Sequence, residues 1–472
     1  MAPNVKAHEE ISLVVEEESN NNNNNNNNGR IENTLASMRD RDRQKSEMGV
    51  DKSRERWSSG VVFHPQGRFW RIGGEWYDFD AFDHPGGREI LYLARDRFDD
   101  ATYAFEAHHL DYKRARAIIR KYKLAKPLQK ELNDSHPVPA PQLLGDESFY
   151  SDVRRRVVKH FRDQKLSMEP NTQCLALFWL TLVLWILSHA NLLLWNPTVP
   201  FAMLHGLVSC VLGAFGHDFV HHPKYKWMAY LCLDPIGLSS DSWFREHVLQ
   251  HHMYTNTPLD NHFKGTDPFL VTDPTIPRNW FQRTLTPYLN PIILFFGIWG
   301  NFSFHTGELI KGHEKLSPWK LFFPAMVATY VYKHGIIWGA ILSLVQTGTL
   351  GVYYFTNALM NHNSHQCLDI NLRNKQTDWG AAQIISCADW ATQASFISSM
   401  RFLWLNYHCV HHLFPLIDQC HHKQVQVILM QACKDHGLEY ETGSFWDIYK
   451  QMVHSFSTPL SLWKEINSYN GS

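Results

Sequence analysis

Long apolar runs divide the second part of the chain and predict helices that cross a membrane. The runs at residues 174–195 and 335–360 are of bilayer-spanning length, and the run at 199–215 is somewhat shorter. As a helix, the run at 335–360 extends over about 39 Å, enough to cross with some tilt. Three further apolar segments are shorter, and they occupy residues 227–238, 288–304 and 321–332.

Charge and parity set the expected path through the bilayer. The basic stretch at 152–165 precedes the first run and places its start in the cytosol. If the histidine groups near residues 250 and 410 share a site, the chain between them crosses the membrane an even number of times. Two of the last three apolar segments then cross, namely 335–360 and either 288–304 or 321–332. Lys333 argues against one helix through 321–345, because a central lysine is costly in a membrane. We therefore expect about four transmembrane helices, with 227–238 at the membrane surface.

The first 56 residues have too little apolar content to form a core. They include nine consecutive asparagines, Asn20 to Asn28, which predict a disordered low-complexity tail. The opening residues lack the apolar core of a signal peptide, so membrane insertion is expected to rely on the internal runs. A second tail is expected at 456–472.

Residues 57–126 predict a small α+β soluble domain. Two short strands, at 69–72 and 75–78, flank a Gly-Gly turn. His84-Pro85-Gly86-Gly87 predicts a sharp turn, and helical segments follow up to His108-His109. The prolines of the next stretch discourage regular structure, so residues 127–170 are expected to form a linker and an amphipathic approach to the membrane.

Composition excludes some functions. The 45 basic and 46 acidic residues nearly cancel, which argues against a nucleic-acid-binding protein. The 17 tryptophans suit the interface belts of a membrane protein. The eight cysteines form no CxxC pair, which is typical of a reducing compartment without a disulfide framework.

Histidines cluster at ligand spacing. Because residues four apart on a helix share a face, His247 and His251 are predicted to converge on one point, with His252 beside them. With two similar groups and one histidine after the last run, the candidate ligands are His217, His221, His247, His251, His252, His362, His408, His411 and His412. One metal needs about four protein ligands, so nine imidazoles predict two metals. Imidazole suits zinc, copper, nickel or iron, and composition does not choose among them.

These motifs resemble a known family. HDxxH at 217–221, HxxxHH at 247–252 and HxxHHLFP at 408–415 resemble the histidine boxes of membrane fatty acid desaturases. The resemblance implies an all-α integral membrane domain at 171–455 whose di-iron centre uses oxygen and two electrons to desaturate an acyl chain. His362 matches the family's isolated ligand, with His365 as the alternative, and His222 is a further candidate. His408 departs from the glutamine usual in front-end desaturases, so the position of the new double bond does not follow.

A second resemblance covers the small domain. HPGG followed by DATxxF and a histidine resembles cytochrome b5, as fused to front-end desaturases. It implies haem b between His84 and His109, with His108 as the alternative ligand. The segment between Tyr77 and His84 is about two residues shorter than usual in that family. A haem ligated on both faces favours electron transfer.

The two resemblances together imply partners and a location. Electrons would come from cytochrome b5 reductase, and the other partners would be O2, membrane lipids and an acyl-lipid or acyl-CoA substrate. The protein would lie in the endoplasmic reticulum membrane, with the haem domain and metal site on the cytosolic face, and would serve unsaturated fatty acid biosynthesis. Candidates for orienting the ligands are Asp218, Glu246 and Asp267, and candidates for shaping a substrate tunnel are Trp379, Gln383, Trp404 and Asn406.

Three alternatives stay open at this point. A lipid hydroxylase would share the first hydrogen abstraction. A sphingoid-base desaturase would differ only in its substrate. A membrane-anchored haem electron carrier with an inactive membrane part would need no intact histidine boxes.

Overall fold

The computed structural model describes residues 69–97, 100–125, 143–257, 259–260, 262, 265–274, 276–311 and 316–457. All of them belong to one compact unit. The expected N-terminal tail lies outside the described residues, as do part of the expected linker and all but the first two residues of the expected C-terminal tail.

The small domain opens with an antiparallel hairpin. Strand β1 (Trp70–Ile72) pairs with β2 (Glu75–Tyr77), and Trp70 lies opposite Tyr77. The turn between the strands consists of Gly73 and Gly74, whose positive φ angles of 62° and 78° favour glycine. The N–H of Gly74 donates to the buried carboxylate of Asp100 at 3.0 Å, which ties the hairpin to the start of the helix at Thr102–His108.

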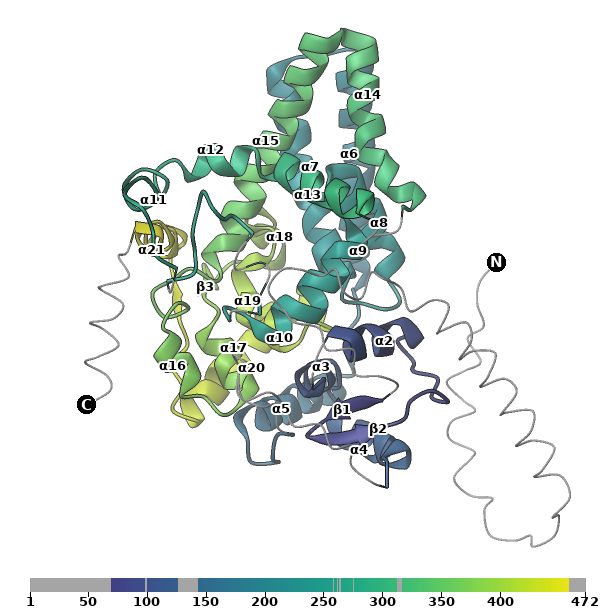
Figure 1. The fold of residues 1–472 in the computed structure, drawn as a ribbon, viewed down its shortest axis with the longest axis vertical. Helices are drawn as coiled ribbons and strands as arrows, with labels where there is room; N and C mark the ends of the chain where they lie inside the picture. The colour runs from purple at the N-terminus through teal and green to yellow at the C-terminus, as the bar shows by residue number, and fades with distance from the viewer. Residues whose placement is uncertain are drawn as a thin grey trace, which may run out of the picture. The chain divides into compact units, whose positions relative to one another are not determined.

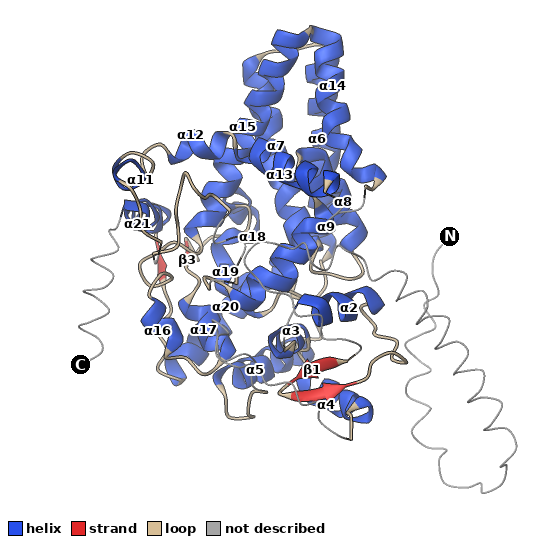
Figure 2. Ribbon diagram, viewed as in Figure 1, coloured by secondary structure: helices blue, strands red, loops and turns tan. Residues whose placement is uncertain are grey.

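Short helices complete the small domain around buried aromatic side chains. They are α2 (Arg88–Arg97), α3 (Thr102–His108), α4 (Tyr112–Ile119) and η4 (Arg120–Tyr122). Phe79 packs against Trp70 and stacks on Tyr77, with ring centroids 5.3 and 5.5 Å apart. The described part of this domain is therefore α+β (Figure 2).

Helix α5 (Phe149–Asp163) occupies much of the expected amphipathic approach. Ser148 caps its N-terminus by accepting from the N–H of Ser151, and one face buries Val153 and Val157. That face packs against α20 (His422–Asp435), so the segment is part of the fold.

Three of the described helices are long and apolar enough to cross a membrane. They are α6 (Thr172–Leu194), α7 (Val199–Phe219) and α15 (Ile336–Met360), close to the predicted runs. Helices α7 and α15 pack closely, because a Cβ added at Gly206 would lie 2.5 Å from the carbonyl oxygen of Gln346. The second helix reaches four residues beyond the predicted run and includes His217.

Helix α14 (Phe322–His334) has 13 residues and runs beside the three long helices (Figure 1). It ends before Gly335, whose φ of 82° separates it from α15, as expected from Lys333. The Tyr330 hydroxyl lies 2.8 Å from Nδ1 of His189, and His334 Nε2 lies 3.1 Å from the carbonyl oxygen of Leu192. The C-terminal ends of α14 and α6 are therefore side by side.

The segment at 288–304, which was the alternative to 321–332 as a membrane crossing, is not one helix. Helix α12 (Asn290–Phe295) ends at Phe296, and α13 (Gly297–Ile310) begins directly after it. The segment at 227–238 likewise divides into α8 (Lys226–Leu233) and η5 (Asp234–Ile236).

The remaining elements lie around the ends of the long helices. They are α9 (Ser240–Trp243), the π-helix η6 (Phe244–His251), α10 (His252–Tyr254), α11 (Trp280–Thr284), η8 (Pro318–Leu321), α16 (Ile370–Asn374), α17 (Trp379–Ile385), β3 (Asp389–Trp390), α18 (Phe396–Ser399), η9 (Met400–Phe402), η10 (Leu405–Tyr407), α19 (His408–Leu413), η11 (Gln419–His421), β4 (Thr442–Gly443) and α21 (Phe445–Ser457). Strands β3 and β4 form a short parallel pair. Helices α6, α7, α14 and α15 rise together at the top of the view, and most of the other elements lie below them (Figure 1).

Candidate metal centre

All nine histidines predicted as metal ligands are buried at the ends of helices. They belong to the end of α7, the turn after α7, the π-helix η6, helix α10, the two residues that follow α15, and helix α19. Their donor atoms form two groups, and within each group every donor lies within 4.8 Å of every other. The five-histidine cluster contains His217, His221, His247, His252 and His411, and the four-histidine cluster contains His251, His362, His408 and His412.

The two clusters are neighbours. The rings of His252 and His412 stack with centroids 4.2 Å apart and an interplanar angle of 11°. One ring belongs to each cluster, so two metals bound here would lie close to each other.

The second histidine box divides its ligands in a way that the spacing did not predict. The expected convergence of His247 and His251 is confirmed, because their donor atoms lie within 4.8 Å of each other together with one of His262. The partner of His247 within its own cluster is nevertheless His252, with Nε2 atoms 3.1 Å apart. His251 Nε2 instead approaches His362 Nε2 at 3.1 Å. The physical reason is that Phe244–His251 forms a π-helix, whose i to i+5 periodicity brings residues five apart onto one face.

The third box follows ordinary α-helical spacing. In α19, His408 and His412 are four residues apart and their Nε2 atoms lie 3.1 Å apart. His411 lies on another face, and its ring is 4.5 Å from that of His217 in the five-histidine cluster. A single short helix therefore contributes to both clusters.

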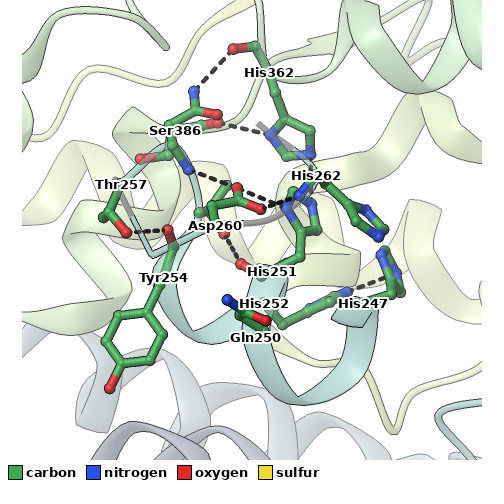
Figure 3. A network of polar contacts seen from close by, with 12 residues as sticks. His247, Gln250, His251, His252, Tyr254, Thr257, Asp260, His262, His362 and Ser386 are labelled. Carbon is green, nitrogen blue, oxygen red and sulfur yellow. Dashed lines mark hydrogen bonds and ion pairs between the residues drawn. The ribbon is translucent and has the colours of Figure 1, made fainter. Parts of the chain in front are cut away.

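Hydrogen bonds at Nδ1 fix the tautomers of two members of the four-histidine cluster, His251 and His362. His362 Nδ1 donates to the carbonyl oxygen of Ser386 at 2.9 Å, because a carbonyl only accepts. His251 Nδ1 donates to the carboxylate of Asp260, also at 2.9 Å (Figure 3). Burial alone would raise the pKa of Asp260, but His251 and other neighbours lower it, so the carboxylate is ionised and accepts.

These tautomers require a cation between the rings. When Nδ1 carries the proton, Nε2 of a neutral imidazole holds a lone pair. The Nε2 atoms of His251 and His362 are nevertheless 3.1 Å apart, and Nε2 of His362 lies 2.9 Å from that of His408. The converging lone pairs of His251 and His362 repel unless a metal lies between them. Ligand nitrogens at roughly 2.1 Å from a metal and at right angles are roughly 3 Å apart, so the spacing fits a bound metal.

Burial keeps the imidazoles in the form that binds metal. It lowers the pKa of His362 to about 3. It lowers the pKa values of His247, His408 and His412 well below the usual range, and neighbouring imidazoles add to the effect. The rings are therefore neutral at physiological pH, as metal ligation requires.

Asp260 is an orienting residue that the sequence analysis missed. It lies nine residues after its partner His251, and its carboxylate also accepts from the N–H of Asn256 at 2.9 Å. The sequence analysis missed Asp260 because no regular spacing relates an acidic residue in that loop to His251. Of the predicted orienting acids, Asp218 lies 3.6 Å from His222 Nε2, and the roles of Glu246 and Asp267 stay predictions.

The residues predicted to shape a tunnel occupy buried positions with other described contacts. The side-chain oxygen of Gln383 lies 3.1 Å from Nδ1 of His412, which makes it a candidate orienting group. Trp379 donates to the carbonyl oxygen of Met253, and Trp404 donates to that of Phe396. The side-chain amide of Asn406 donates to the hydroxyl of Ser399. Their role in a tunnel stays a prediction.

Histidines next to the boxes fall outside the two clusters. His365, the alternative to His362, is exposed, and its Nε2 lies 2.9 Å from Nδ1 of His454. His222 is buried beside Asp218 and Asp418. His262, which the sequence analysis missed, stacks near His247 and His251 with centroids 5.3 and 4.9 Å away; it follows a loop and matches no box spacing.

Comparison with known proteins agrees with this site. The family model described as "Fatty acid desaturase" matches residues 193–444, more than half of the chain. The chain therefore belongs to the fatty acid desaturase family and is an oxidoreductase of lipid metabolism with a histidine-rich metal site.

Individual relatives are distant but cover most of the chain. It is 25% identical to "Acyl-lipid (8-3)-desaturase B" of Dictyostelium discoideum, over 76% of this chain and 83% of the relative. It is 26% identical to "Acyl-lipid (8-3)-desaturase" of Mortierella alpina, over 85% and 96%. It is 24% identical to "sn-1 linoleoyl-lipid 6-desaturase" of Arthrospira platensis, over 62% and 87%. No solved structure matches.

Proposed function

We propose that this protein is a front-end type desaturase that introduces a double bond into the acyl chain of a lipid, with two irons in the histidine clusters. The observation that carries the proposal is the convergence of imidazole nitrogens in two adjacent, buried clusters. The names of the relatives, several of which are acyl-lipid desaturases, favour an acyl-lipid over an acyl-CoA.

Iron is the metal that suits this reaction. Desaturation removes two hydrogens and consumes electrons, whereas zinc has no redox chemistry. When bound, iron supplies the activation of O2 needed to break C–H bonds of a methylene. The protein holds the ligands in their neutral tautomers through Asp260, the Ser386 carbonyl and Gln383, and its buried site excludes water.

We further propose that haem b binds between His84 and His109 and receives electrons from cytochrome b5 reductase. The two rings are perpendicular, with centroids 5.9 Å apart, which leaves room for an iron at roughly 2 Å from each ligand nitrogen. His109 Nδ1 donates to the carbonyl of Phe105 at 2.7 Å, so its Nε2 is free to ligate. His84 Nδ1 accepts from Gly86 N–H at 3.0 Å, and ligation through Nε2 requires it to give up that bond.

The same proposal includes a topology. Helix α14 is the fourth crossing, because its C-terminal end lies beside that of α6 while α7 and α15 return to the histidines. Four crossings satisfy the parity derived from the sequence. The haem domain and the metal site then share the cytosolic face, which we place at the endoplasmic reticulum.

Expression in yeast tests the proposal. Cells would be supplied with fatty acids of varied length and unsaturation, and total lipids would be analysed by gas chromatography with location of double bonds. We expect a new double bond that disappears in His411→Ala and persists in the matched control His365→Ala.

Other products decide between the alternatives. Hydroxylated chains would show a hydroxylase, and unsaturated sphingoid bases would show a sphingolipid substrate. A haem spectrum without bound non-haem iron and without new lipids would support the electron carrier with an inactive membrane part. His408 is a strong metal ligand at a position where the front-end subfamily usually has glutamine. The subfamily therefore does not predict the position of the double bond, and the lipid analysis has to locate it.

A further inference from the structure

Helix α3 precedes a proposed haem ligand and contacts a residue near the five-histidine cluster. His109 follows it directly and faces His84 across a centroid distance of 5.9 Å. From the same helix, Tyr103 packs against Tyr254 at 5.9 Å and against Trp379 at 6.4 Å. Tyr254 is two residues after a ligand of the five-histidine cluster.

His108 is the histidine of this helix that the haem proposal leaves without a function. Its Nδ1 donates to the carbonyl of Ala104 at 2.9 Å, so its Nε2 holds a lone pair. That atom is buried and has no hydrogen-bond partner within the described part of the chain.

His108 shares helix α3 with Tyr103 and directly precedes His109, the proposed haem ligand. Along the helix it therefore lies between the ring contacts of Tyr103 and the haem pair.

A buried ion-pair group fixes this helix in place. The carboxylate of Glu106 in α3 binds Arg116 Nη2 at 2.5 Å and Arg154 Nη1 of α5 at 2.8 Å. The side chains of Glu106 and Arg154 are fully buried, and the guanidinium of Arg154 lies between the rings of Tyr112 and Tyr150 at 4.0 and 4.4 Å. Removing one partner would leave an uncompensated buried charge, so the contact resists separation.

Hydrogen bonds of Tyr150 connect this buried ion-pair group to the third histidine box. The Tyr150 hydroxyl donates to the carbonyl of Leu413 at 2.7 Å, next to His412. Its backbone N–H donates to Asp378, the N-cap of α17, at 3.1 Å. The position of α3 is therefore fixed relative to the helices that carry the ligands.

We propose that α3 is the electron-transfer contact between the haem pair and the five-histidine cluster, with His108 and Tyr103 as bridging residues and Glu106 as the positioning residue. This inference rests on the proposed function. With haem and iron bound, one electron would pass from the reduced haem, which would become ferric, to the metal cluster, which would be reduced by one electron. The bridging side chains keep their oxidation state, no bond breaks, and a flavoprotein reductase restores the haem. Two such transfers serve each double bond.

The test for the bridge is haem reoxidation in the full-length protein loaded with haem and iron. The haem would be reduced beforehand and mixed with O2 and acyl-lipid in a stopped-flow spectrometer. We expect His108→Leu and Tyr103→Leu to slow reoxidation by about tenfold or more, with an unchanged haem spectrum and iron content. Tyr92→Leu, an exposed tyrosine of the same domain, and His365→Leu are matched controls that should keep the wild-type rate.

Two results would overturn the inference. Reoxidation at the wild-type rate in both variants would show that electrons take another route. Loss of the six-coordinate spectrum in His108→Leu would show that His108 is a haem ligand. The proposed function itself would be contradicted if the wild-type protein bound no haem, or if the rate of haem reoxidation did not depend on the acyl-lipid substrate.

The positioning role has its own readout that needs no turnover. In hydrogen–deuterium exchange of the loaded full-length protein, Glu106→Gln should raise amide exchange over residues 102–119 by about tenfold or more. Glu75→Gln, which removes a half-exposed pair with Lys123 at 3.1 Å, is the matched control and should leave exchange there unchanged. Equal amide exchange in both variants would contradict the positioning role of Glu106.

Discussion

The two histidine clusters share ligand chemistry but differ in what holds their rings. In the four-histidine cluster, Nδ1 of His251, His362 and His412 bonds a carboxylate, a backbone carbonyl and a side-chain amide. In the five-histidine cluster, Nδ1 of His247 and His252 lacks a partner within the described residues, and both nitrogens of His221 do too. The difference teaches that one cluster is preorganised by the protein, whereas the rings of the other depend more on bound metal for their orientation.

Removal of a ligand from either cluster should have the largest effect. His411→Ala and His412→Ala remove neighbouring residues of α19 that belong to different clusters. Each should reduce product formation by more than the roughly 10–100-fold typical of losing an orienting partner. Product analysis in cells and iron content of the purified variants measure this. Desaturation surviving in one variant would mean that its cluster is not needed.

Acid should destabilise the metal-free protein. Burial lowers the folded-state pKa of His362 to about 3, against about 6.5 in an unfolded chain. Between those values the unfolded state binds protons that the folded state does not, so stability is complete above a pH of about 6.5 and declines as the pH falls toward 3. Thermal unfolding of the metal-free protein at pH values of about 8, 6.5 and 5 checks this. A melting temperature that stays constant or rises on acidification would contradict it.

Loss of the Asp260 carboxylate should weaken the four-histidine cluster selectively. Asp260→Asn removes the charge that orients His251, and metal affinity at that cluster should fall about 10–100-fold. In a chelator titration, the wild type should lose the metal of the five-histidine cluster first. The variant should reverse that order or make the two losses coincide. Asp273→Asn serves as a control outside the clusters, and an unchanged order in Asp260→Asn would contradict the comparison.

Gln383→Leu should have the smallest effect of the series. It deprives His412 Nδ1 of a neutral acceptor at 3.1 Å, and a neutral hydrogen bond contributes about 0.5–1.5 kcal/mol. We expect a loss of product rate of about tenfold or less. The matched control is Gln376→Leu, whose side chain donates to the carbonyl of Leu372. A loss as severe as that of His412→Ala would indicate that Gln383 has a more direct role.

The long helices and the identity of the ligands could be predicted from the sequence because each depends on local pattern. Apolar runs gave the three long spans, and the histidine spacing gave all nine members of the two clusters. The choice between 288–304 and 321–332 could not be made locally. Our proposal that 321–332 crosses uses the break at Phe296 and the contacts of α14 with α6, which no local pattern contains.

The division of ligands between clusters was beyond the sequence. The HxxxHH spacing correctly predicts that His247 and His251 lie close together, but it does not show that the π-helix also brings His252 to His247 and that His251 joins the other cluster. Asp260 was missed because its loop is placed by the tertiary fold. The contact between α3 and α5 was missed for the same reason, since Glu106 and Arg154 are far apart in the chain.

The most direct test of the account is the iron content of the purified full-length protein, measured by elemental analysis after correction for haem iron. The account predicts two non-haem irons per chain in the wild type, and fewer in both His411→Ala and His412→Ala. A single non-haem metal per chain, or a full complement of zinc in active protein, would contradict the two-iron assignment.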